Sequence, residues 1–316
     1  MSTNNSNELF HSEDCIQHAN QFIQEFPLRR AEIGQGTVIK RALPSRHKRM
    51  IGAWCFLDHA GPAHFEAGQG LDVGPHPHIG LQTFTWMIDG TMYHSDSLGT
   101  DNQLIRPRQV NLMTAGYGIS HTEVAPETET QMHAAQLWIA LPDDKVNMAP
   151  AFENYPDLPV VQEQGLEVTV LVGDYLNTHS PVKVHTELLG VDLYAAETTR
   201  ARLPLNAAFE YGFMALEGSA SINGHELTQD NMVVIEPGLQ CVEVEIQAGS
   251  RVLLLGGEPF ETPILLWWNF VARTQAEIEL AREQWIAGHE RFGHIANYSG
   301  ERLKAPELPS GMRASK

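Results

Sequence analysis

Short runs of apolar or alternating residues, each closed by turn-forming residues, fill two long stretches of this chain and leave few folds open to it. In the first stretch, residues 28–141, the runs lie at 52–57, 82–88, 110–114 and 134–140. Asp89-Gly90 is a tight-turn signal within this stretch. Similar runs resume at 167–172 and recur as far as 251–255. Strands this short and this regularly interrupted are typical of β-sandwiches and barrels, so we predict an all-β fold.

The chain has 316 residues, which is too long for one compact core and favours two domains. Residues 142–166 are rich in proline and acid and are interpreted as a linker. Because the two halves share one layout of turns and strands, we expect an internal duplication of one barrel. We expect an N-terminal helical extension at residues 1–27 and an N-terminal barrel at 28–150. A C-terminal barrel is expected at 151–290 and a tail at 291–316.

Two helices are expected at the ends of the chain. Residues 12–26 begin with Ser12 as a plausible N-cap and carry one apolar stripe, made of Ile16, Ala19, Phe22, Ile23 and Phe26. Thr274 and Glu277 form a capping box, and the apolar face that follows is Ile278, Ala281 and Trp285. The residues after Arg291 show no periodicity and are expected to form an extended tail.

Composition excludes several functional classes. The formal net charge of −18 disfavours direct binding to nucleic acid, and the one basic concentration, from Arg41 to Arg49, is interpreted as a solvated strand entrance. No run of eighteen apolar residues is present, so no membrane span is expected, and the polar N-terminus does not resemble a secretory signal. Cys15, Cys55 and Cys241 lie far apart, as expected for reduced thiols in the cytoplasm.

Four residues of the first half form the candidate metal site. His76 and His78 are two residues apart, and so are His121 and Glu123. Because side chains alternate along a strand, each pair points to one face, and two such strands facing into a barrel would bring three imidazoles and one carboxylate together. That donor set suits a divalent transition metal and leaves coordination positions free for chemistry.

Beyond this donor set, the sequence resembles the cupin superfamily and, within it, the pirin family. The resemblance rests on residues 56–62, 75–80, 113–123 and 255–259, with Phe270 and residues 274–277, and it spans roughly residues 28–295. It implies two cupin (jelly-roll type) barrels in tandem, with one metal, usually iron, held in the N-terminal barrel by His76, His78, His121 and Glu123. The family includes members that open the flavonol quercetin with dioxygen and others that act as regulatory binding proteins.

The sequence departs from the pirin pattern at two places. Gln82 stands where pirins commonly have a glutamate; we expect it to orient the substrate or a metal-bound water rather than to bind metal. Pro107-Arg108-Gln109 replaces the family's Pro-Gly-Asp turn. In the second barrel the corresponding ligand positions fall at Pro204 and Asn206, which cannot replace imidazoles, so a structural role is expected there.

The leading hypothesis is a metal-dependent dioxygenase of the quercetin 2,3-dioxygenase type, which acts on a small aromatic substrate and dioxygen. Glu123 would be both ligand and proton acceptor. Fe(II) is the expected metal, and copper, nickel, manganese or zinc would also suit the ligands. Residues expected in a substrate pocket or, equally, in plain barrel core are Phe84, Trp86, Leu112, Met113 and Trp138.

Two other hypotheses stay open. One is a redox-sensing module that binds a protein partner according to the oxidation state of its metal. The other is a barrel that binds metal without catalysis. Four other histidines are interpreted as structural or solvent-facing, and one of them, His59, could support the metal site; the four are His59, His64, His94 and His133.

Overall fold

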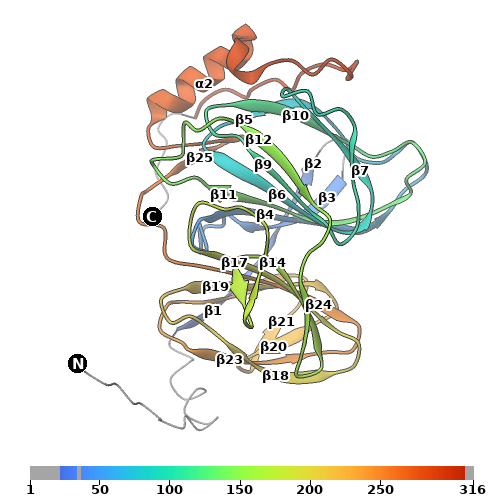
Figure 1. Ribbon diagram of the computed structural model, residues 1–316, viewed down its shortest axis with the longest axis vertical. Helices are drawn as coiled ribbons and strands as arrows, with labels where there is room; N and C mark the ends of the chain where they lie inside the picture. Colours follow the sequence, from blue (N-terminus) through green and yellow to red (C-terminus); the bar gives the residue numbers. More distant parts are fainter. Residues whose placement is uncertain (1–21, 34–36, 310–316) are drawn as a thin grey trace.

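Two β-barrels stacked along the long axis of the molecule make up the fold (Figure 1). The computed structural model describes residues 22–33 and 37–309. Each barrel consists of one seven-stranded and one four-stranded sheet, and the fold is mostly β, which confirms the prediction of two cupin-type barrels. In the described residues no helix has the length and apolar character that a membrane span requires.

The N-terminal barrel, at the top in Figure 1, contains the candidate metal ligands. Its seven-stranded sheet runs in the order β12 (Ala151–Tyr155), β9 (Val110–Thr114), β6 (Leu81–Gly90), β11 (Gln131–Ala140), β4 (Trp54–His64), β3 (Thr37–Leu43), β2 (Arg29–Ile33). Its four-stranded sheet runs in the order β5 (Asp72–His78), β10 (Ile119–Val124), β7 (Met92–Asp96), β8 (Gln103–Ile105).

The C-terminal barrel repeats this arrangement strand for strand. Its seven-stranded sheet is ordered β1 (Ile23–Pro27), β22 (Asn231–Ile235), β19 (Glu210–Glu217), β24 (Ser250–Gly257), β17 (Leu188–Ala195), β14 (Leu166–Val172), β13 (Val160–Glu163). Its four-stranded sheet is ordered β18 (Thr199–Pro204), β23 (Cys241–Ile246), β20 (Ala220–Ile222), β21 (His225–Leu227). The shared order is the layout that an internal duplication predicts.

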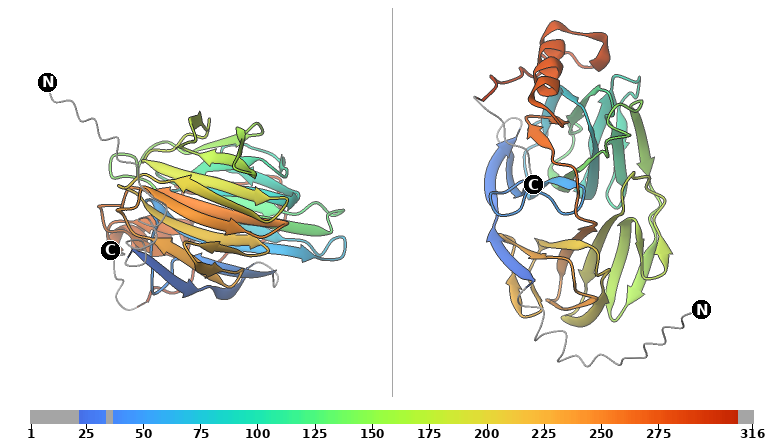
Figure 2. Two further views of the ribbon diagram at one scale, coloured as in Figure 1. Left: turned by 90° about the horizontal axis from the view of Figure 1, so that it is seen from below. Right: turned by 90° about the vertical axis from the view of Figure 1, so that its left-hand side faces the viewer.

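One edge strand of each large sheet comes from outside the barrel that it completes. β1 pairs with β22 of the C-terminal barrel although it precedes the N-terminal one, and β12 pairs with β9 of the N-terminal barrel (Figures 1 and 2). The predicted helix over residues 12–26 is therefore wrong for residues 23–26, which belong to β1, and residues 12–21 lie outside the described residues. The predicted linker at 142–166 is also wrong, because it contains β12 and β13, an edge strand of each sheet. The four domain limits stay predictions.

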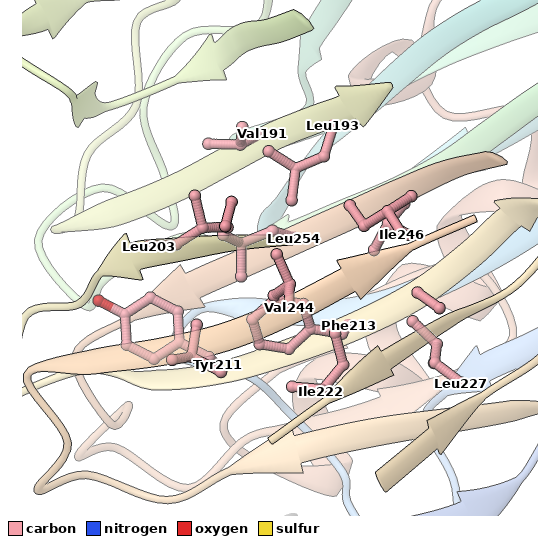
Figure 3. Packing of buried hydrophobic residues seen from close by; sticks show 14 of the residues in the cluster. Val191, Leu193, Leu203, Tyr211, Phe213, Ile222, Leu227, Val244, Ile246 and Leu254 are labelled. Carbon is pink, nitrogen blue, oxygen red and sulfur yellow. The ribbon is translucent and has the colours of Figure 1, made fainter. Parts of the chain in front are cut away.

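The two largest of the five apolar clusters lie in the C-terminal barrel and between the barrels. One fills the interior of the C-terminal barrel, where residues such as Val191, Phe213 and Leu254 point toward one another (Figure 3). The other lies between the barrels and joins Trp54, Phe84 and Leu137 of the first to residues of the second. The barrels therefore share a core, and neither buries its large sheet alone.

Polar contacts also cross between the barrels. Lys48 binds the carboxylates of Glu210 and Glu236, at 2.5 and 2.9 Å, and Arg41 binds Asp58 within its own barrel. Of the basic segment 41–49, Arg41 and Lys48 are thus ion-paired, whereas Arg46, His47 and Arg49 are exposed, as expected for a solvated strand entrance. Cys55 and Cys241 are both buried free thiols.

The C-terminal segment returns to the N-terminal barrel and covers it (Figure 1). It contains the hairpin of β25 (Leu265–Trp267) and β26 (Phe270–Ala272), the helix α2 (Gln275–Ala287) and the 3₁₀ turn η1 (Glu290–Phe292). A smaller hairpin, formed by β15 (Asp174–Tyr175) and β16 (Thr178–His179), belongs to the C-terminal barrel. The capping box of Thr274 and Glu277 is confirmed, as is the buried face of α2. Residues 293–309 contain no helix or strand but are docked, since Tyr298 donates to Asp72 and the Leu303 amide donates to the Pro75 carbonyl.

Candidate metal centre

Strands β5 and β10 bring the three histidines together inside the N-terminal barrel. They pair antiparallel with His121 opposite His76 and Ile119 opposite His78, so that the histidines share one face. The turn after His78 requires a glycine: Gly80 has φ +68°, and a Cβ there would lie 2.1 Å from the Val271 carbonyl oxygen. That close approach places β26 directly against the site.

In each of the three rings the Nδ1 atom is already engaged. Nδ1 of His76 lies 2.9 Å from the Gly74 carbonyl oxygen, and Nδ1 of His78 lies 3.1 Å from the Asn269 carbonyl oxygen. A carbonyl only accepts hydrogen bonds, so both Nδ1 atoms carry the proton and both Nε2 atoms present lone pairs. His121 uses its Nδ1 in a contact with His94 at 3.4 Å.

The free ring nitrogens converge on one point. Ligand atoms of all three histidines lie within 4.8 Å of one another, and Nε2 of His78 is 3.1 Å from Nε2 of His121. Burial is the main cause that lowers the pKa of His76 to about 4 and those of His78 and His121 well below the ordinary value. Neutral imidazoles whose lone pairs face each other at this range are a donor set that fits a metal cation.

A buried histidine and aspartate sit behind His121. Nε2 of His94 lies 3.1 Å from a carboxylate oxygen of Asp96, and both residues are buried on β7. Burial alone would raise the pKa of Asp96, but hydrogen bonds from His94 and Thr100 hold it below the ordinary value. A neutral His94 that donates to Asp96 can only accept at Nδ1, so His121 donates to it and keeps its own Nε2 free.

Glu123 lines the same cavity as the histidines but stands apart from their cluster. The pairing of β10 with β5 shifts register between His121 and Glu123. The ligand atoms of the three histidines lie within 4.8 Å of one another, and the Glu123 carboxylate is not part of that group. Burial raises the pKa of Glu123 to about 7. In the described part of the chain this carboxylate has no hydrogen-bond partner, which leaves it available to a cation or a substrate hydroxyl.

The cavity has a volume of about 560 Å³, within the range of small-molecule sites. Phe56 and Trp138 stack at 4.0 Å between ring centroids and form one wall, and Trp138 also meets the edge of the His78 ring at 5.2 Å. Trp268 of the C-terminal hairpin and Leu303 of the docked tail complete the apolar lining. The site is thus closed in part by segments that are distant in sequence.

Gln82 is not brought to the histidines. Its side-chain nitrogen donates to Thr114 at 2.9 Å and to the Lys183 carbonyl at 3.3 Å, whereas its neighbour Thr83 lines the cavity. Adjacent residues of a strand face opposite ways, so Gln82 points toward the second barrel. Of the five aromatic and aliphatic residues considered for the substrate pocket, only Trp138 lines the cavity. Phe84, Trp86 and Leu112 belong to the core between the barrels. Met113 belongs to the apolar cluster that contains Trp138.

The other histidines have separate places. His59 and His133 are both buried, and their Nε2 atoms lie 2.8 Å apart on the side of the large sheet that faces the second barrel, so His59 does not support the metal site. His64 is exposed. His94 is buried in a strand and contacts a candidate ligand, so it is not solvent-facing.

The matching strand pair of the second barrel presents no histidine. β18 pairs with β23 as β5 pairs with β10, but the side chains that reach the interior are all apolar: Ala201, Leu203, Val242, Val244 and Ile246. These apolar residues fill the space that imidazoles occupy in the first barrel.

Sequence reasoning missed His94 and Asp96, although a signal was present. They are two residues apart, and once residues 92–96 are taken as a strand the rule that singled out the ligand pairs places them on one face. The Asn269 carbonyl had no such signal, because it reaches His78 from 191 residues away.

The fold and this site together define a bicupin whose N-terminal barrel holds a histidine cluster fit for one metal ion. Comparison with known proteins carries the assignment further. The sequence matches the family described as Pirin over residues 36–139 and the Pirin C-terminal cupin domain over residues 190–293. The chain belongs to the pirin family.

Relatives of the chain cover nearly its whole length. A candidate quercetin 2,3-dioxygenase of Pseudomonas aeruginosa is 49% identical over 96% of each chain. A pirin-like protein of Caulobacter vibrioides is 36% identical over 89% of this chain and 98% of its own. A crystal structure described as quercetin 2,3-dioxygenase from Acinetobacter baumannii is 74% identical, covers 94% of this chain and 99% of its own, and superimposes with a TM-score of 0.93.

Proposed function

We propose that this protein is a metal-dependent dioxygenase that opens flavonols such as quercetin with dioxygen. The observation that carries the proposal is the convergence of three neutral Nε2 atoms, from His76, His78 and His121, in an aromatic-lined cavity of about 560 Å³. The names of the similar proteins from Pseudomonas and Acinetobacter support the same reaction class.

The proposed ligands are the three histidines and Glu123, and the proposed metal is Fe(II), with copper, nickel, manganese and zinc as chemically acceptable alternatives. A bound metal of this kind lowers the pKa of a coordinated hydroxyl and gives dioxygen a place beside it. Because Glu123 is not within the histidine cluster, its bond to a metal would be the loosest of the four.

The residues of the chain supply binding and proton transfer. Trp138 and Phe56 offer a flat apolar wall to an aromatic substrate, and Trp268 covers it from the C-terminal hairpin. Glu123 accepts the proton of the substrate hydroxyl, because its carboxylate lines the cavity and has no hydrogen-bond partner among the described residues. Gln82, which points away from the cavity, has no role in this scheme.

The test is aerobic incubation of the iron- or copper-loaded protein with quercetin, recorded as loss of the flavonol absorbance together with oxygen consumption. We expect His78→Ala to abolish the loss and to keep the fold, because its ring packs at the cavity rather than in an apolar core. His64→Ala, which removes an exposed histidine of the same barrel, is the matched control and should leave turnover unchanged. An unchanged absorbance with every first-row metal tried would remove the enzyme proposal.

A non-enzymatic redox-sensing module that binds a protein partner is the second candidate. The net charge of −18 favours it, because such a surface suits a basic partner. A partner that co-purifies in stoichiometric amount with one iron oxidation state only would support it. We expect either activity in the cytoplasm, consistent with the unpaired thiols of Cys55 and Cys241.

A further inference from the structure

The interior face of the large sheet in the N-terminal barrel carries a row of polar side chains beside the aromatic wall of the cavity. Thr85 lies opposite Gln136, Gln136 opposite Asp58, and Asp58 opposite Arg41, on the neighbouring strands β6, β11, β4 and β3. We call these four residues the polar row. Side chains that face each other on adjacent strands are close neighbours, so the polar row runs straight across the sheet.

The polar row lies farther from the histidine cluster than the aromatic wall does. Trp138 follows Gln136 by two residues on β11, and Phe56 precedes Asp58 by two on β4, so each pair shares the interior face. Trp138 is the residue that meets the edge of the His78 ring. Because two residues of a strand span about 7 Å, the order along the cavity is histidines, aromatic rings, polar row.

The side-chain amide of Gln136 has one free end. Its oxygen accepts a hydrogen bond from the Thr85 hydroxyl at 2.7 Å, whereas its nitrogen bonds to no group of the described residues. The nitrogen is not one of the solvent-inaccessible unpaired atoms of the described residues, so solvent reaches it. Because β11 is flanked by β6 and β4 and Gln136 lines the cavity, that access is from the cavity. The nitrogen can therefore donate to a bound molecule.

The ion pair of the polar row leaves this nitrogen available. Asp58 stands opposite Gln136, but both of its oxygens accept from Arg41, each at 2.6 Å. Arg41 also lies over the Phe56 ring, at 4.5 Å from the centroid, which holds the guanidinium against the aromatic wall. The carboxylate oxygens are thus engaged, and the Gln136 nitrogen stays free for a ligand.

Thr83 adds a second polar group on the same face. It lies opposite Trp138, diagonally from Gln136, and it lines the cavity. Its hydroxyl has no hydrogen-bond partner in the described ranges and is not one of the inaccessible unpaired atoms there, so it too is open to the cavity. A hydroxyl both donates and accepts.

The charges at this end of the cavity are balanced. Arg29 and Glu32 are exposed on β2 at the rim, and with Arg41 and Asp58 they give two charges of each sign. No excess charge therefore requires an ionised group on the ligand. A free amide nitrogen and a free hydroxyl together suit a hydroxyl group of the ligand, which can accept from the first and donate to the second.

We propose that Gln136, with Thr83 beside it, is a specificity-determining residue that binds a ring hydroxyl at the end of the substrate away from the histidines. The inference rests on the proposed flavonol site. A flavonol whose reacting oxygens lie at the histidine cluster would pass along Trp138 and Phe56 and present its outer hydroxyls to the polar row. The preferred substrates are therefore polyhydroxylated flavonols rather than flavonols that carry only the hydroxyl next to the carbonyl.

The test compares quercetin with 3-hydroxyflavone, which keeps the reacting hydroxyl and the carbonyl but has no other hydroxyl group. Affinity is measured by calorimetry on the iron-loaded protein without dioxygen, so that binding is separated from turnover. We expect the wild type to bind quercetin about tenfold more tightly, which is the contribution of one hydrogen bond to a partly buried donor.

Gln136→Leu combined with Thr85→Val removes the amide without leaving the Thr85 hydroxyl unpaired. We expect this variant to bind the two flavonols equally and to keep its affinity for 3-hydroxyflavone. Gln131→Leu makes the same change on β11 at a residue that does not line the cavity, and it should keep the tenfold preference. Should the double variant fail to fold, Gln136→Asn takes its place, because its shorter amide cannot reach Thr85 and the ligand together.

Equal affinity of the wild type for the two flavonols, or a preference that survives in the Gln136 variants, would overturn the proposal. A preference that depends on Gln136 in a protein that never consumes quercetin under air would support it and refute the dioxygenase. Turnover of both flavonols without any difference in affinity would do the reverse.

Discussion

Protons on ring nitrogens decide whether the three candidate ligands can bind a metal. His76 and His78 have their Nδ1 protons fixed by backbone carbonyls, so no side-chain substitution nearby can reverse them. His121 depends instead on His94, whose orientation depends on Asp96. The position of the proton on His121 is thus set by two side chains, His94 and Asp96, and a substitution can reverse the direction of their hydrogen bonds.

Asp96→Asn should reverse the direction of the hydrogen bonds from His121 through His94 while keeping the shape of the side chain at position 96. The amide oxygen can still accept from the Leu98 and Thr100 amides, but the amide nitrogen becomes a donor toward Nε2 of His94. His94 would then donate from Nδ1, and His121 would carry its proton on Nε2, where the metal must bind. We expect metal affinity to fall by about 10- to 100-fold, measured by competition with a chelator.

Asp157→Asn, at an exposed residue with no hydrogen bond in the described chain, is the control and should bind metal as the wild type does. Equal affinity of Asp96→Asn and the wild type would show that His94 does not set the proton on His121.

The residues that the sequence predicted well are those whose spacing in the chain translates directly into a shared face. His76 with His78, and His121 as their partner, follow from the two-residue period of a strand and from the pairing of β5 with β10. Gln82 could not be placed in this way, because its face depends on which side of β6 meets the second barrel. The Asn269 carbonyl depends on a tertiary return of the chain that no local pattern records.

At the scale of single elements, β1 shows how a strand can imitate a helix. Ile23 and Phe26 are three residues apart, which suggests one helical face, yet they lie on opposite faces of β1. Ile23 packs in the interior of the C-terminal barrel and Phe26 in the core between the barrels. Because each face of this strand buries only one residue, at positions three apart, the alternation of a half-buried strand is absent from the sequence.

Phe26→Ala should therefore destabilise the whole protein rather than a terminal extension. Phe26 is 4% exposed in the core between the barrels, and truncation of a buried phenylalanine costs about 3–5 kcal/mol of the free energy of unfolding. Gln24→Ala, at an exposed residue of the same strand, should change it by less than about 0.5 kcal/mol. Urea unfolding of the two variants measures the difference. A small loss for Phe26→Ala would mean that β1 is not part of the shared core.

At the scale of the whole molecule, a buried polar chain links the barrels. His59 contacts His133, whose Nδ1 lies 3.4 Å from a Glu217 oxygen; Glu217 and Asp192 both pair with Arg251, and Trp86 donates to Asp192 at 3.0 Å. Burial, with the nearby charges of His133 and Lys40, lowers the pKa of His59 to about 3. The interface is thus built for a neutral His59.

This arrangement predicts a loss of stability in acid. In the unfolded chain His59 has a pKa near 6.5, so between that value and about 3 the unfolded state binds a proton that the folded state excludes. Stability is fully present above pH 6.5 and falls by about 1.4 kcal/mol per pH unit as the pH drops through this window. His59→Gln, which cannot titrate, should reduce the slope by about one proton between pH 6 and pH 4.

Urea unfolding of metal-free protein at several pH values measures that slope, and the exposed His64→Gln is the control that should keep it. A slope unchanged in His59→Gln would assign the acid sensitivity to other groups.

The hydrogen bond from His78 to the Asn269 carbonyl also decides at what point of protein synthesis the histidine cluster is complete. When His121 has left the ribosome, all three imidazoles exist, yet the partner that orients one of them is still untranslated. The nascent chain must grow past β26 before His78 acquires its fixed tautomer. The geometry of the histidine cluster is therefore complete only after most of the chain has been synthesised, and a chain that ends before Asn269 would carry the three histidines without the partner that orients His78.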